Sequence, residues 1–411
     1  MPLHPVLETE ESTAHPVVYT LLYLPFGIST GYVTVTLAYL LAHAGLSVGA
    51  VAGLMALQVF PQSWKVVWAP IVDATLTARR WFVFATVATA ATLVATALLP
   101  ARPGSLWLLS VFVFLSSVAG GTSAMATEVL MTHATPHHLR GRVGGWSQAG
   151  NLGGVGLGGG AGLWMAQHVA PWSAGVVLGL VCLGCIAALW FVREPSRPHA
   201  GLHFFANLAS VGRDLWTIAR RRSGYLTVLL FLIPISTGAA SSLWSAVADD
   251  WRASADTVAL VNGALGGLVS MAGCLVGGPL FDRMDRRTGY WVSGLLQAAV
   301  AVGMALAPRS PAMFVVFTCA YAFSNGFIYA AFTAVVLETI GKGSAATSYN
   351  LLASCSNVPI TYLTLVDGWA HGRWGTSGML YTEGVLAVGA VVVLGLATFV
   401  TQPSLPEPAR G

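Results

Sequence analysis

Lys65 and Asp73 are two ionisable residues in one apolar stretch and are the first candidates for chemistry. Eight residues separate them, which is about 12 Å along a helix axis. An ammonium group in a membrane helix is costly unless it reaches water, a partner or a cavity. The Lys65 side chain could extend to the inner membrane interface, or it could offer a fixed positive charge to a carboxylate or phosphate on a solute. Both interpretations stay open.

Glu128 and Glu338 occupy equivalent places in two similar parts of the chain, 210 residues apart. Glu338 lies near the end of the tenth predicted helix. Glu128 lies 12 residues before Arg140 and therefore deeper in the bilayer. A buried carboxyl group at that depth can exchange a proton, so Glu128 is the candidate proton-coupling residue.

Neutral polar side chains are concentrated on a few of the predicted helices. Each one alone is more often a helix–helix hydrogen bond than a ligand contact. Their concentration nevertheless indicates a polar, aromatic-lined cavity that suits a sugar-like or nucleotide-like solute. The candidate substrate-binding residues, besides Lys65, are Tyr23, Gln58, Gln62, Gln148, Asn151, Tyr329, Tyr349, Asn350 and Asn357.

The sequence offers few residues for catalysis or metal binding by histidines, paired carboxylates or thiols. His43, His168 and His371 lie at the outer ends of predicted helices, and no carboxylate pair is expected at membrane depth. The five cysteines all fall inside apolar runs. We therefore expect no catalytic residue, metal site, cofactor or disulfide framework, and a membrane enzyme is disfavoured.

The composition of the whole chain sets the class of protein. Its 411 residues are 55% hydrophobic and 9% charged, and the mean hydropathy is +0.70. Such values exclude a water-soluble globular domain and predict an integral membrane protein. The expected partners are the lipid bilayer and a small-molecule solute, not nucleic acid.

Apolar stretches bounded by charge, proline or glycine predict twelve transmembrane helices. They lie at 17–42, 47–72, 81–100, 105–131, 143–167, 172–193, 225–248, 257–281, 289–308, 311–337, 345–366 and 378–400. A long polar segment, 194–224, separates the first six from the last six. Basic residues in alternate loops number fifteen on one side and four on the other, which predicts that both termini and this segment are cytoplasmic.

Internal repeats predict the arrangement of these helices. Residues 69–73 (APIVD) are echoed by 278–282 (GPLFD) at an offset of 209, and the ISTG of 28–31 returns at 235–238. The chain is therefore expected to form two homologous six-helix halves, 1–193 and 225–411, joined by a linker at 194–224. Parallel halves of this kind are related by an axis along the membrane normal and hold the solute between them.

Glycines recur every four residues in the fifth predicted helix, at Gly150, Gly154, Gly158 and Gly162. Gly263 and Gly267 match them in the eighth helix. Small residues at this spacing let helix backbones approach closely and slide. We expect this stripe to be the surface on which the two halves rock.

Several stretches resemble one family of membrane proteins. Residues 277–287 (GGPLFDRMDRR) resemble the loop signature of major facilitator transporters. Residues 61–73 (PQSWKVVWAPIVD) are similar to the second-helix motif of AmpG-type muropeptide permeases and the related acetyl-CoA transporters. Residues 23–27 (YLPFG), and 345–354 with 356–357 (AATSYNLLAS, SN), resemble the same subfamily.

The resemblance implies an all-α membrane protein with the major facilitator fold and its two pseudo-symmetric halves. It implies a secondary transporter that works by alternating access on an anionic, muropeptide-like or acyl-CoA-like solute, driven by a proton gradient or by the solute gradient. It implies gating residues near the loops, namely Asp73, Asp282, Arg283, Arg286 and Glu338. Among these, the resemblance implies that Glu338 pairs with arginines of the neighbouring loop. We also expect a monomer in a bacterial inner membrane. The alternative is a transporter-shaped sensor or scaffold that moves nothing.

Overall fold

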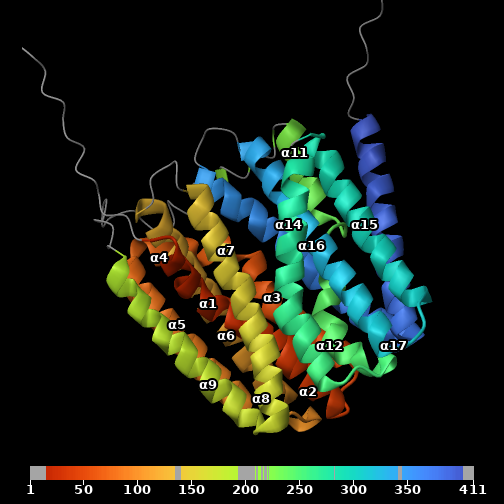
Figure 1. The fold of residues 1–411 in the computed structure, drawn as a ribbon. Helices are drawn as coiled ribbons and strands as arrows, with labels where there is room; N and C mark the ends of the chain where they lie inside the picture. Colours follow the sequence, from red (N-terminus) through yellow and green to blue (C-terminus); the bar gives the residue numbers. More distant parts are fainter. Residues whose placement is uncertain are drawn as a thin grey trace, which may run out of the picture.

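The structure, a computed structural model, describes residues 15–134, 140–192, 209, 212–213, 216, 220, 222–281, 283–340 and 345–400. All regular secondary structure in these ranges is helical, which confirms the expected all-α fold. Figure 1 shows the helices running side by side between two ends of the molecule. We call the end that holds Val17, Val192 and Arg222 the linker end, and the end that holds His43, Leu98 and Trp251 the far end.

Helical segments follow one another through the first half of the chain. They are α1 (Val17–Gly31), η1 (Tyr32–Leu37), α2 (Ala38–His43), α3 (Val48–Ser63), α4 (Lys65–Ala74), α5 (Ala78–Leu98), η2 (Pro103–Ser105), α6 (Leu106–Ala134), α7 (Arg140–Gly156), η4 (Leu157–Ala161), α8 (Gly162–His168), α9 (Pro171–Gly184) and η5 (Cys185–Phe191).

The second half has a similar series of segments. They are α11 (Arg222–Leu232), η6 (Ala239–Leu243), α12 (Trp244–Val247), η7 (Ala248–Trp251), α13 (Ala255–Val258), η8 (Ala259–Leu265), α14 (Gly266–Phe281), α15 (Arg286–Leu306), α16 (Pro311–Ile340) and α17 (Ala345–Val400). Within α17, Gly375 adopts φ 68° and ψ −171° and divides it into two helices.

Helix occupies the intervals at which the sequence predicts spans, and eight stretches of the described residues are long and apolar enough to cross a membrane. The number of crossings stays a prediction. The linker at 194–224 lies largely outside the described residues, so the boundaries of the two halves also stay a prediction.

Two predicted helices are interrupted in the structure: 47–72 at Trp64, and 225–248 after Leu232. The sequence predicts continuous helix over 225–248, but α11 ends at Leu232 and helix resumes at Ala239. Pro234 has no backbone N–H to donate, and both Ser236 and Gly238 have positive φ, at 60° and 67°. The hydrophobic pattern predicts the span. It does not predict this break, because it contains no information on backbone dihedral angles.

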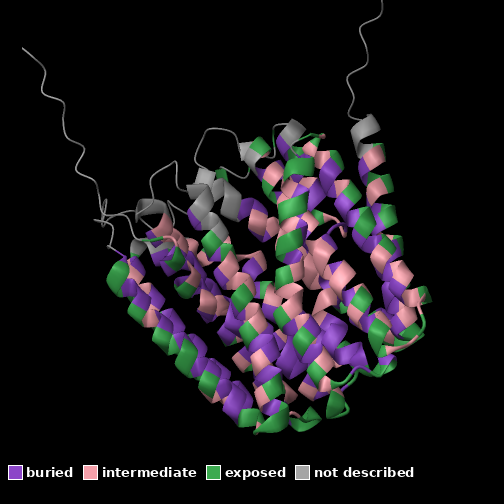
Figure 2. Ribbon diagram, viewed as in Figure 1, coloured by how far each residue is buried: buried purple, intermediate pink, exposed green. Residues whose placement is uncertain are grey.

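The buried apolar side chains show how the two halves meet. One large cluster at the far end combines both halves, for example Leu41 and Val51 with Trp244 and Phe314. The two other clusters described lie toward the linker end, and each belongs to one half only. In Figure 2 the buried residues accordingly gather toward the far end. The halves share a core at the far end and keep separate cores at the linker end.

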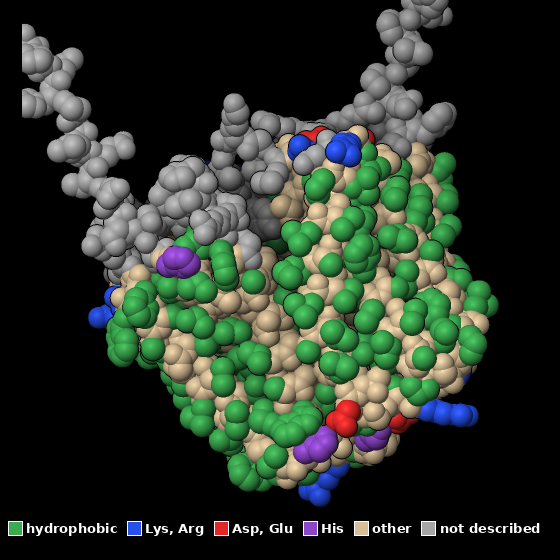
Figure 3. Space-filling view, in the orientation of Figure 1, with side chains coloured by type: hydrophobic (Ala, Val, Ile, Leu, Met, Phe, Trp, Pro, Cys, Tyr) green, Lys and Arg blue, Asp and Glu red, His purple; other side chains and the backbone are tan. Residues whose placement is uncertain are grey.

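The outer surface suits a lipid environment. Large apolar side chains face outward along the helices, including Trp190, Leu275 and Leu306, each more than two-thirds exposed. Figure 3 shows hydrophobic side chains over the sides of the molecule and the charged and histidine side chains mainly at its two ends. Exposed apolar surface of this extent is expected where acyl chains rather than water surround the protein.

Candidate functional site

Lys65 begins α4 directly after a break in the helix. α3 ends at Ser63, and Trp64 leaves the helical region with φ −128° and ψ 17°. The Ser63 hydroxyl lies 3.2 Å from the Thr361 hydroxyl of α17, so the break touches the second half. Lys65 is half-buried, and no described side chain forms an ion pair with its ammonium group. The described surroundings thus leave this cation available to an anionic ligand.

Aromatic side chains flank Lys65. Trp64 packs edge-on against Trp68 with ring centroids 4.7 Å apart, and Phe60 lies 6.0 Å from Trp64. The indole nitrogens of Trp64 and Trp68 are buried and have no hydrogen-bond partner among the described residues. A buried N–H without a partner is costly, so a polar ligand at this break would satisfy donors as well as charge.

Tyr23 and Glu128 meet across two helices. The Tyr23 hydroxyl of α1 donates to Glu128 Oε1 of α6 at 2.7 Å. Tyr23 is 6% exposed and Glu128 is half-buried. Two residues that the sequence assigned to different roles, substrate binding and proton coupling, are therefore one hydrogen-bonded unit.

Gln58 and Gln62 bind neighbouring helices. Gln58 Nε2 donates to Thr30 Oγ1 at 3.2 Å, and Gln62 Nε2 donates to the backbone oxygen of Ser117 at 3.0 Å. Both glutamines are buried. These contacts join α3 to α1 and to α6, which is the ordinary role of an amide between membrane helices.

The remaining substrate-binding candidates are spread over several helices. Asn151 Nδ2 donates to Gln148 Oε1 at 3.3 Å on α7, and Asn357 Nδ2 donates to the Ala353 backbone oxygen at 3.0 Å on α17. Tyr329 is 54% exposed on α16. The side chains of Tyr349 and Asn350 lie outside the described residues. The ligand role of these residues stays a prediction.

The gating candidates lie at the linker end. Arg286 Nε at the start of α15 is 3.7 Å from Glu338 Oε2 of α16, and both side chains are partly exposed. Arg283 is exposed, while Asp282 and the side chain of Asp73 lie outside the described residues. An ion pair between α15 and α16 has the geometry that the sequence analysis expects for Glu338, and its role in gating stays a prediction.

Asp285 caps α15 beside this ion pair. Its Oδ2 accepts from the backbone N–H and from the hydroxyl of Thr288, each at 2.8 Å. The backbone hydrogen bond of Thr288 lowers the pKa of this carboxyl group below its ordinary value, and the positive charge of Arg287 acts in the same direction.

Two carboxyl groups inside the second half were missed by the sequence analysis. Asp367 is 0% exposed and Glu383 is 4% exposed, both on α17, and the Tyr321 hydroxyl of α16 donates to Glu383 Oε1. The expectation that no carboxylate pair lies at membrane depth is therefore wrong. The available signal was an acid inside each of two apolar runs, eight residues before and eight residues after Gly375.

Histidine–aspartate pairs join the two halves at the far end. His43 Nε2 of α2 lies 3.2 Å from Asp249 Oδ1 of η7, and His168 Nε2 of α8 lies 3.7 Å from Asp256 Oδ1 of α13. Each imidazole also stacks on an aromatic ring of its own helix, Tyr39 or Trp164. We call these two contacts the far-end latch.

The glycine stripe of α7, η4 and α8 faces a different partner from the one predicted. A Cβ on Gly158 would lie 2.1 Å from the Ile28 backbone oxygen of α1. The other members of the stripe also meet the first helix, namely Gly150, Gly154 and Gly162. The prediction that this stripe lies between the halves is therefore wrong for these four glycines, which lie on the side of the helix that packs within the first half. Gly263 and Gly267, the other members of the prediction, do lie against the first half.

Other glycines lie between the halves. A Cβ on Gly263 of η8 would lie 2.5 Å from Gly160 Cα of η4, and a Cβ on Gly156 would be 3.5 Å from the Gly263 backbone oxygen. Gly156 and Gly160 are also four residues apart, but they lie on another face of the same helix. Two π-helical segments, η4 and η8, thus approach backbone to backbone across the interface.

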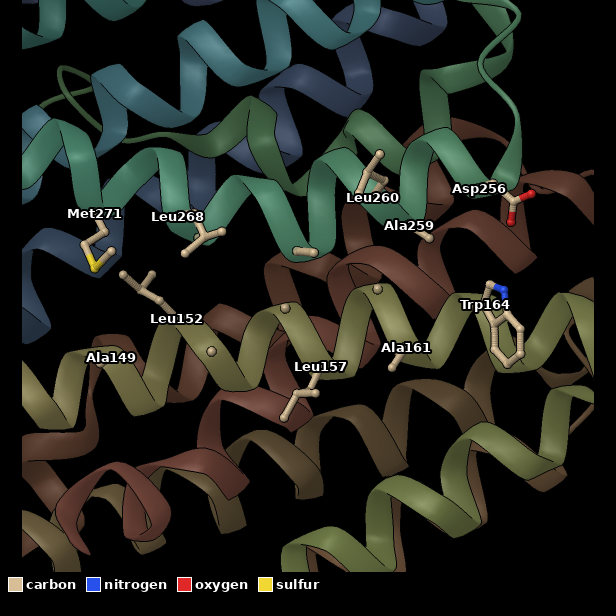
Figure 4. Close-up of a pocket in the computed structure, with 15 residues that line it drawn as sticks. Ala149, Leu152, Leu157, Ala161, Trp164, Asp256, Ala259, Leu260, Leu268 and Met271 are labelled. Atoms are coloured by element: carbon tan, nitrogen blue, oxygen red, sulfur yellow. The ribbon is translucent and has the colours of Figure 1, made fainter. Parts of the chain in front are cut away.

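An apolar groove of about 900 Å³ lies beside this interface. Leu152, Leu157, Leu260 and Leu268 line it, together with glycines and Asp256 near the far end. Figure 4 shows the groove along two neighbouring helices, that of α7–α8 and that of α13–α14, with Leu152 and Leu268 between them. Its lining is nearly devoid of polar groups and its leucines are partly exposed, so it differs from the polar surroundings of Lys65 and Glu128.

Comparison with known proteins gives a family match over most of the chain. The family model described as Major Facilitator Superfamily matches residues 19–363 and 226–411. The anhydromuropeptide permease of Escherichia coli is 31% identical over 146 residues, which is 34% of this chain and 29% of the permease. The match thus spans less than a third of the curated relative.

Solved structures have the same fold at low sequence identity. A D-xylose–proton symporter superposes with a TM-score of 0.70 at 15% identity, covering 92% of this chain and 96% of the symporter. A transporter of the POT family bound to a thioalcohol-conjugated peptide gives a TM-score of 0.69 at 11% identity, covering 94% of this chain and 96% of the other. At such identities the likeness concerns the fold alone.

Proposed function

The chain belongs to the Major Facilitator Superfamily, and on this premise we propose that it carries a hydrophilic, anionic solute by alternating access, coupled to protons. Membership makes it an integral, multi-pass membrane protein and a secondary transporter of small molecules rather than an enzyme. The charge of the solute, the coupling ion and the identity of the substrate are the parts that we propose.

The observation that carries the proposal is the half-buried ammonium group of Lys65 at the break between α3 and α4. Together with the unpartnered indole nitrogens of Trp64 and Trp68, it offers charge and hydrogen-bond donors to one ligand. A carboxylate or phosphate would satisfy all three groups. A neutral sugar would leave the cation unpaired.

A muropeptide-like solute is favoured over an acyl-CoA-like one. The relative that is 31% identical over part of its length is a permease for anhydromuropeptides. Such molecules combine a sugar with a peptide that ends in carboxylates, so one substrate would use polar, aromatic and cationic groups together. Lys65, Trp64 and Trp68 offer a positive charge, indole N–H donors and aromatic rings to such a substrate.

The way in which the halves meet supports alternating access. The core shared at the far end and the far-end latch keep that side closed, while the linker end has separate cores. Rocking of the halves about the Gly160–Gly263 contact would open the far end and close the linker end. We propose that the linker end faces the cytoplasm of a bacterial inner membrane and that Glu128 takes part in proton coupling.

The test is uptake by the purified protein in liposomes. Anhydromuropeptide should accumulate when a proton gradient is imposed, and uptake should fall when the gradient is collapsed by an ionophore. Its neutral sugar fragment, which lacks the peptide carboxylates, serves as the matched control and should not accumulate.

Different outcomes bear on different parts of the proposal. Equal accumulation of the charged and the neutral compound would contradict an anionic substrate. Accumulation that ignores the proton gradient would contradict proton coupling. Binding of the peptide-bearing compound without any movement across the bilayer would favour a sensor instead.

A further inference from the structure

Asp367 and Glu383 are placed at the same depth by the turn at Gly375. Each lies eight residues from that glycine, one before it and one after it, on two helices that run in opposite directions. Eight residues correspond to about 12 Å along a helix. Both carboxyl groups therefore lie well inside the bundle, about 12 Å from the turn at the far end.

The hydrogen bonds of the two groups differ. Glu383 Oε1 accepts from the Tyr321 hydroxyl, and the backbone of Ala240 in η6 lies near enough to favour the charged form of this carboxyl group. Its other oxygen, Oε2, has no partner among the described residues. For Asp367, neither Oδ1 nor Oδ2 has a partner in the described part of the chain. Glu383 is thus equipped to carry negative charge and Asp367 is not.

No described cation neutralises the pair. The two carboxyl groups are close enough for their charges to interact, and the ion pairs in the described residues lie elsewhere. The repulsion between two like charges in a site of low dielectric disfavours the doubly charged pair. A proton on Asp367 removes one charge, and Glu383 Oε2 is an acceptor without a partner among the described residues.

A line of polar groups leads from the far end toward Asp367. Asp250 is exposed on η7 and accepts a hydrogen bond from the Thr376 hydroxyl. The imidazole Nε2 of His371 lies 3.1 Å from the same hydroxyl. His371 follows Asp367 by one helical turn, about 6 Å along the axis. The first two steps are direct contacts. The last step spans one turn of the same helix and would require a bridging water molecule.

The elements packed around the pair bring few other titratable groups. α3, η6 and α12 contain no Asp, Glu, Lys, Arg or His within their bounds. α16 contributes Tyr321 beside the pair and carries Glu338 near its linker end, where Arg286, Arg287 and Tyr290 of α15 also lie. At the far end, Arg309 and Tyr381 stand near Asp250, and Arg309 Nη2 donates to Ser377 at 2.5 Å.

We propose that Asp367 and Glu383 form a proton-binding site, reached from the far end through Asp250, Thr376 and His371. Binding forms one O–H bond at Asp367 and changes the charge of the pair from −2 to −1, and release reverses both. The inference rests on the proposed proton coupling only for its role in transport. Tyr321 and Glu383 are joined to η6 beside the interrupted helix, so loading the site would act on a backbone break of the kind found near ion sites in transporters.

The bound proton can be observed without transport. Infrared difference spectra of the purified protein between acidic and alkaline pH should contain the C=O band of a buried protonated carboxyl group. Asp367→Asn should remove that band, and Ser354→Ala should keep it. Ser354 is a matched control, because it lies buried on the same helix with an unpartnered hydroxyl and has no assigned role. A band that persists in Asp367→Asn would overturn the site.

Transport then tests the use of the site. In liposomes, Asp367→Asn should reduce the accumulation driven by a proton gradient at least 10-fold. The variant should still exchange labelled for unlabelled substrate. His371→Gln should slow the driven uptake and keep the infrared band. Unchanged driven uptake in Asp367→Asn, or accumulation that follows a sodium gradient at constant pH, would overturn the proposal.

These readouts separate two failures. If the wild-type protein shows no proton-driven uptake while Asp367→Asn still removes the infrared band, the proton site stands and the proposed coupling fails. If driven uptake is lost in Glu128→Gln and kept in Asp367→Asn, coupling stands and this site fails.

Discussion

At the scale of single residues, the informative charges are those whose surroundings do not neutralise them. Lys65 has aromatic neighbours and no described ion-pair partner, whereas Glu128 shares a hydrogen bond with Tyr23. Asp367 is the extreme case, since a fully buried carboxyl group there has no described donor. In a membrane protein such groups indicate function more strongly than surface charges do.

The first prediction concerns Lys65. Lys65→Ala should weaken binding of an anhydromuropeptide by about 2 kcal/mol, roughly 30-fold, because a charged hydrogen bond to the ligand is lost. Lys65→Arg should recover part of the affinity, since the charge is kept while the geometry changes. Affinity is measured on purified protein at two ionic strengths, because a contact in a water-filled cavity weakens as salt rises. An alanine variant with wild-type affinity and salt dependence would show that Lys65 only extends to the interface.

The second prediction concerns Asp285. Its pKa is lowered in the folded protein, so its stabilising effect is present above the ordinary aspartate pKa and is lost as the pH falls through the lower folded value. Asp285→Ala should cost about 1 kcal/mol at neutral pH and almost nothing at a pH below both values. Thermal unfolding of both proteins in detergent across this pH range provides the measurement. A cost that is independent of pH would show that the charge of the carboxylate is not involved.

At the scale of elements, breaks in helices mark the places where function is proposed. One break, at Trp64, separates α3 from α4 and lies beside Lys65. The other lies between α11 and η6, before Ala239, on the side of η6 that is near Glu383. η4 and η8 are π-helical where the halves approach. Such irregular backbone is tolerated inside a membrane only where protein or a cavity surrounds it.

The third prediction separates the two glycine faces of α7 and η4. Gly158→Ala should destabilise the protein by about 1–3 kcal/mol, because its Cβ would overlap the Ile28 backbone oxygen. Gly153→Ala is the matched control, since nothing lies within 4 Å of its Cβ. The measurement is the melting temperature of each variant in the same detergent, which should be lower for Gly158→Ala than for Gly153→Ala. Equal stability would mean that α1 can move away from η4 at little cost.

At the scale of the whole molecule, two halves share a core at one end and are joined there by the far-end latch. The pairs His43–Asp249 and His168–Asp256 each join a histidine of the first half to an aspartate of the second half. A partly exposed ion pair contributes only about 0–1 kcal/mol. Two such pairs can therefore bias an equilibrium between conformations without locking it.

The fourth prediction concerns this latch. Asp249→Asn together with Asp256→Asn should raise, by a few-fold, the rate at which a cysteine in place of Val247 is labelled from the far end. The loss of the carboxylates removes the contacts that join the two halves at this end. Labelling of the asparagine variant at the unaltered rate would show that the latch does not hold that end closed.

The fifth prediction concerns orientation in the membrane. The excess of basic residues at the linker end predicts that it faces the cytoplasm. A cysteine in place of Asn207 should therefore react with an impermeant reagent only after the membrane is opened, whereas one in place of Ser254 at the far end should react in intact cells. The opposite pattern would invert the topology.

The sequence by itself determined the class of the protein, its all-α fold and its relation to major facilitator transporters. These are local properties, because a run of apolar residues is visible in the chain and a bilayer accepts little except helix. Lys65, Glu128 and Glu338 could be named for the same reason, as charges where charge is costly.

Only the tertiary structure decided which faces meet. α7 and η4 carry glycines on more than one face, so the spacing of these glycines did not indicate which of them contact α1 and which contact η8. Asp367 and Glu383 lie 16 residues apart in sequence and meet because the turn at Gly375 folds one helix back beside the other. Their burial also depends on α16 and on the interrupted helix before η6, elements that are distant in the chain. Contacts of this kind follow from the rotation and register of packed helices, which the hydrophobic pattern of a buried span does not encode.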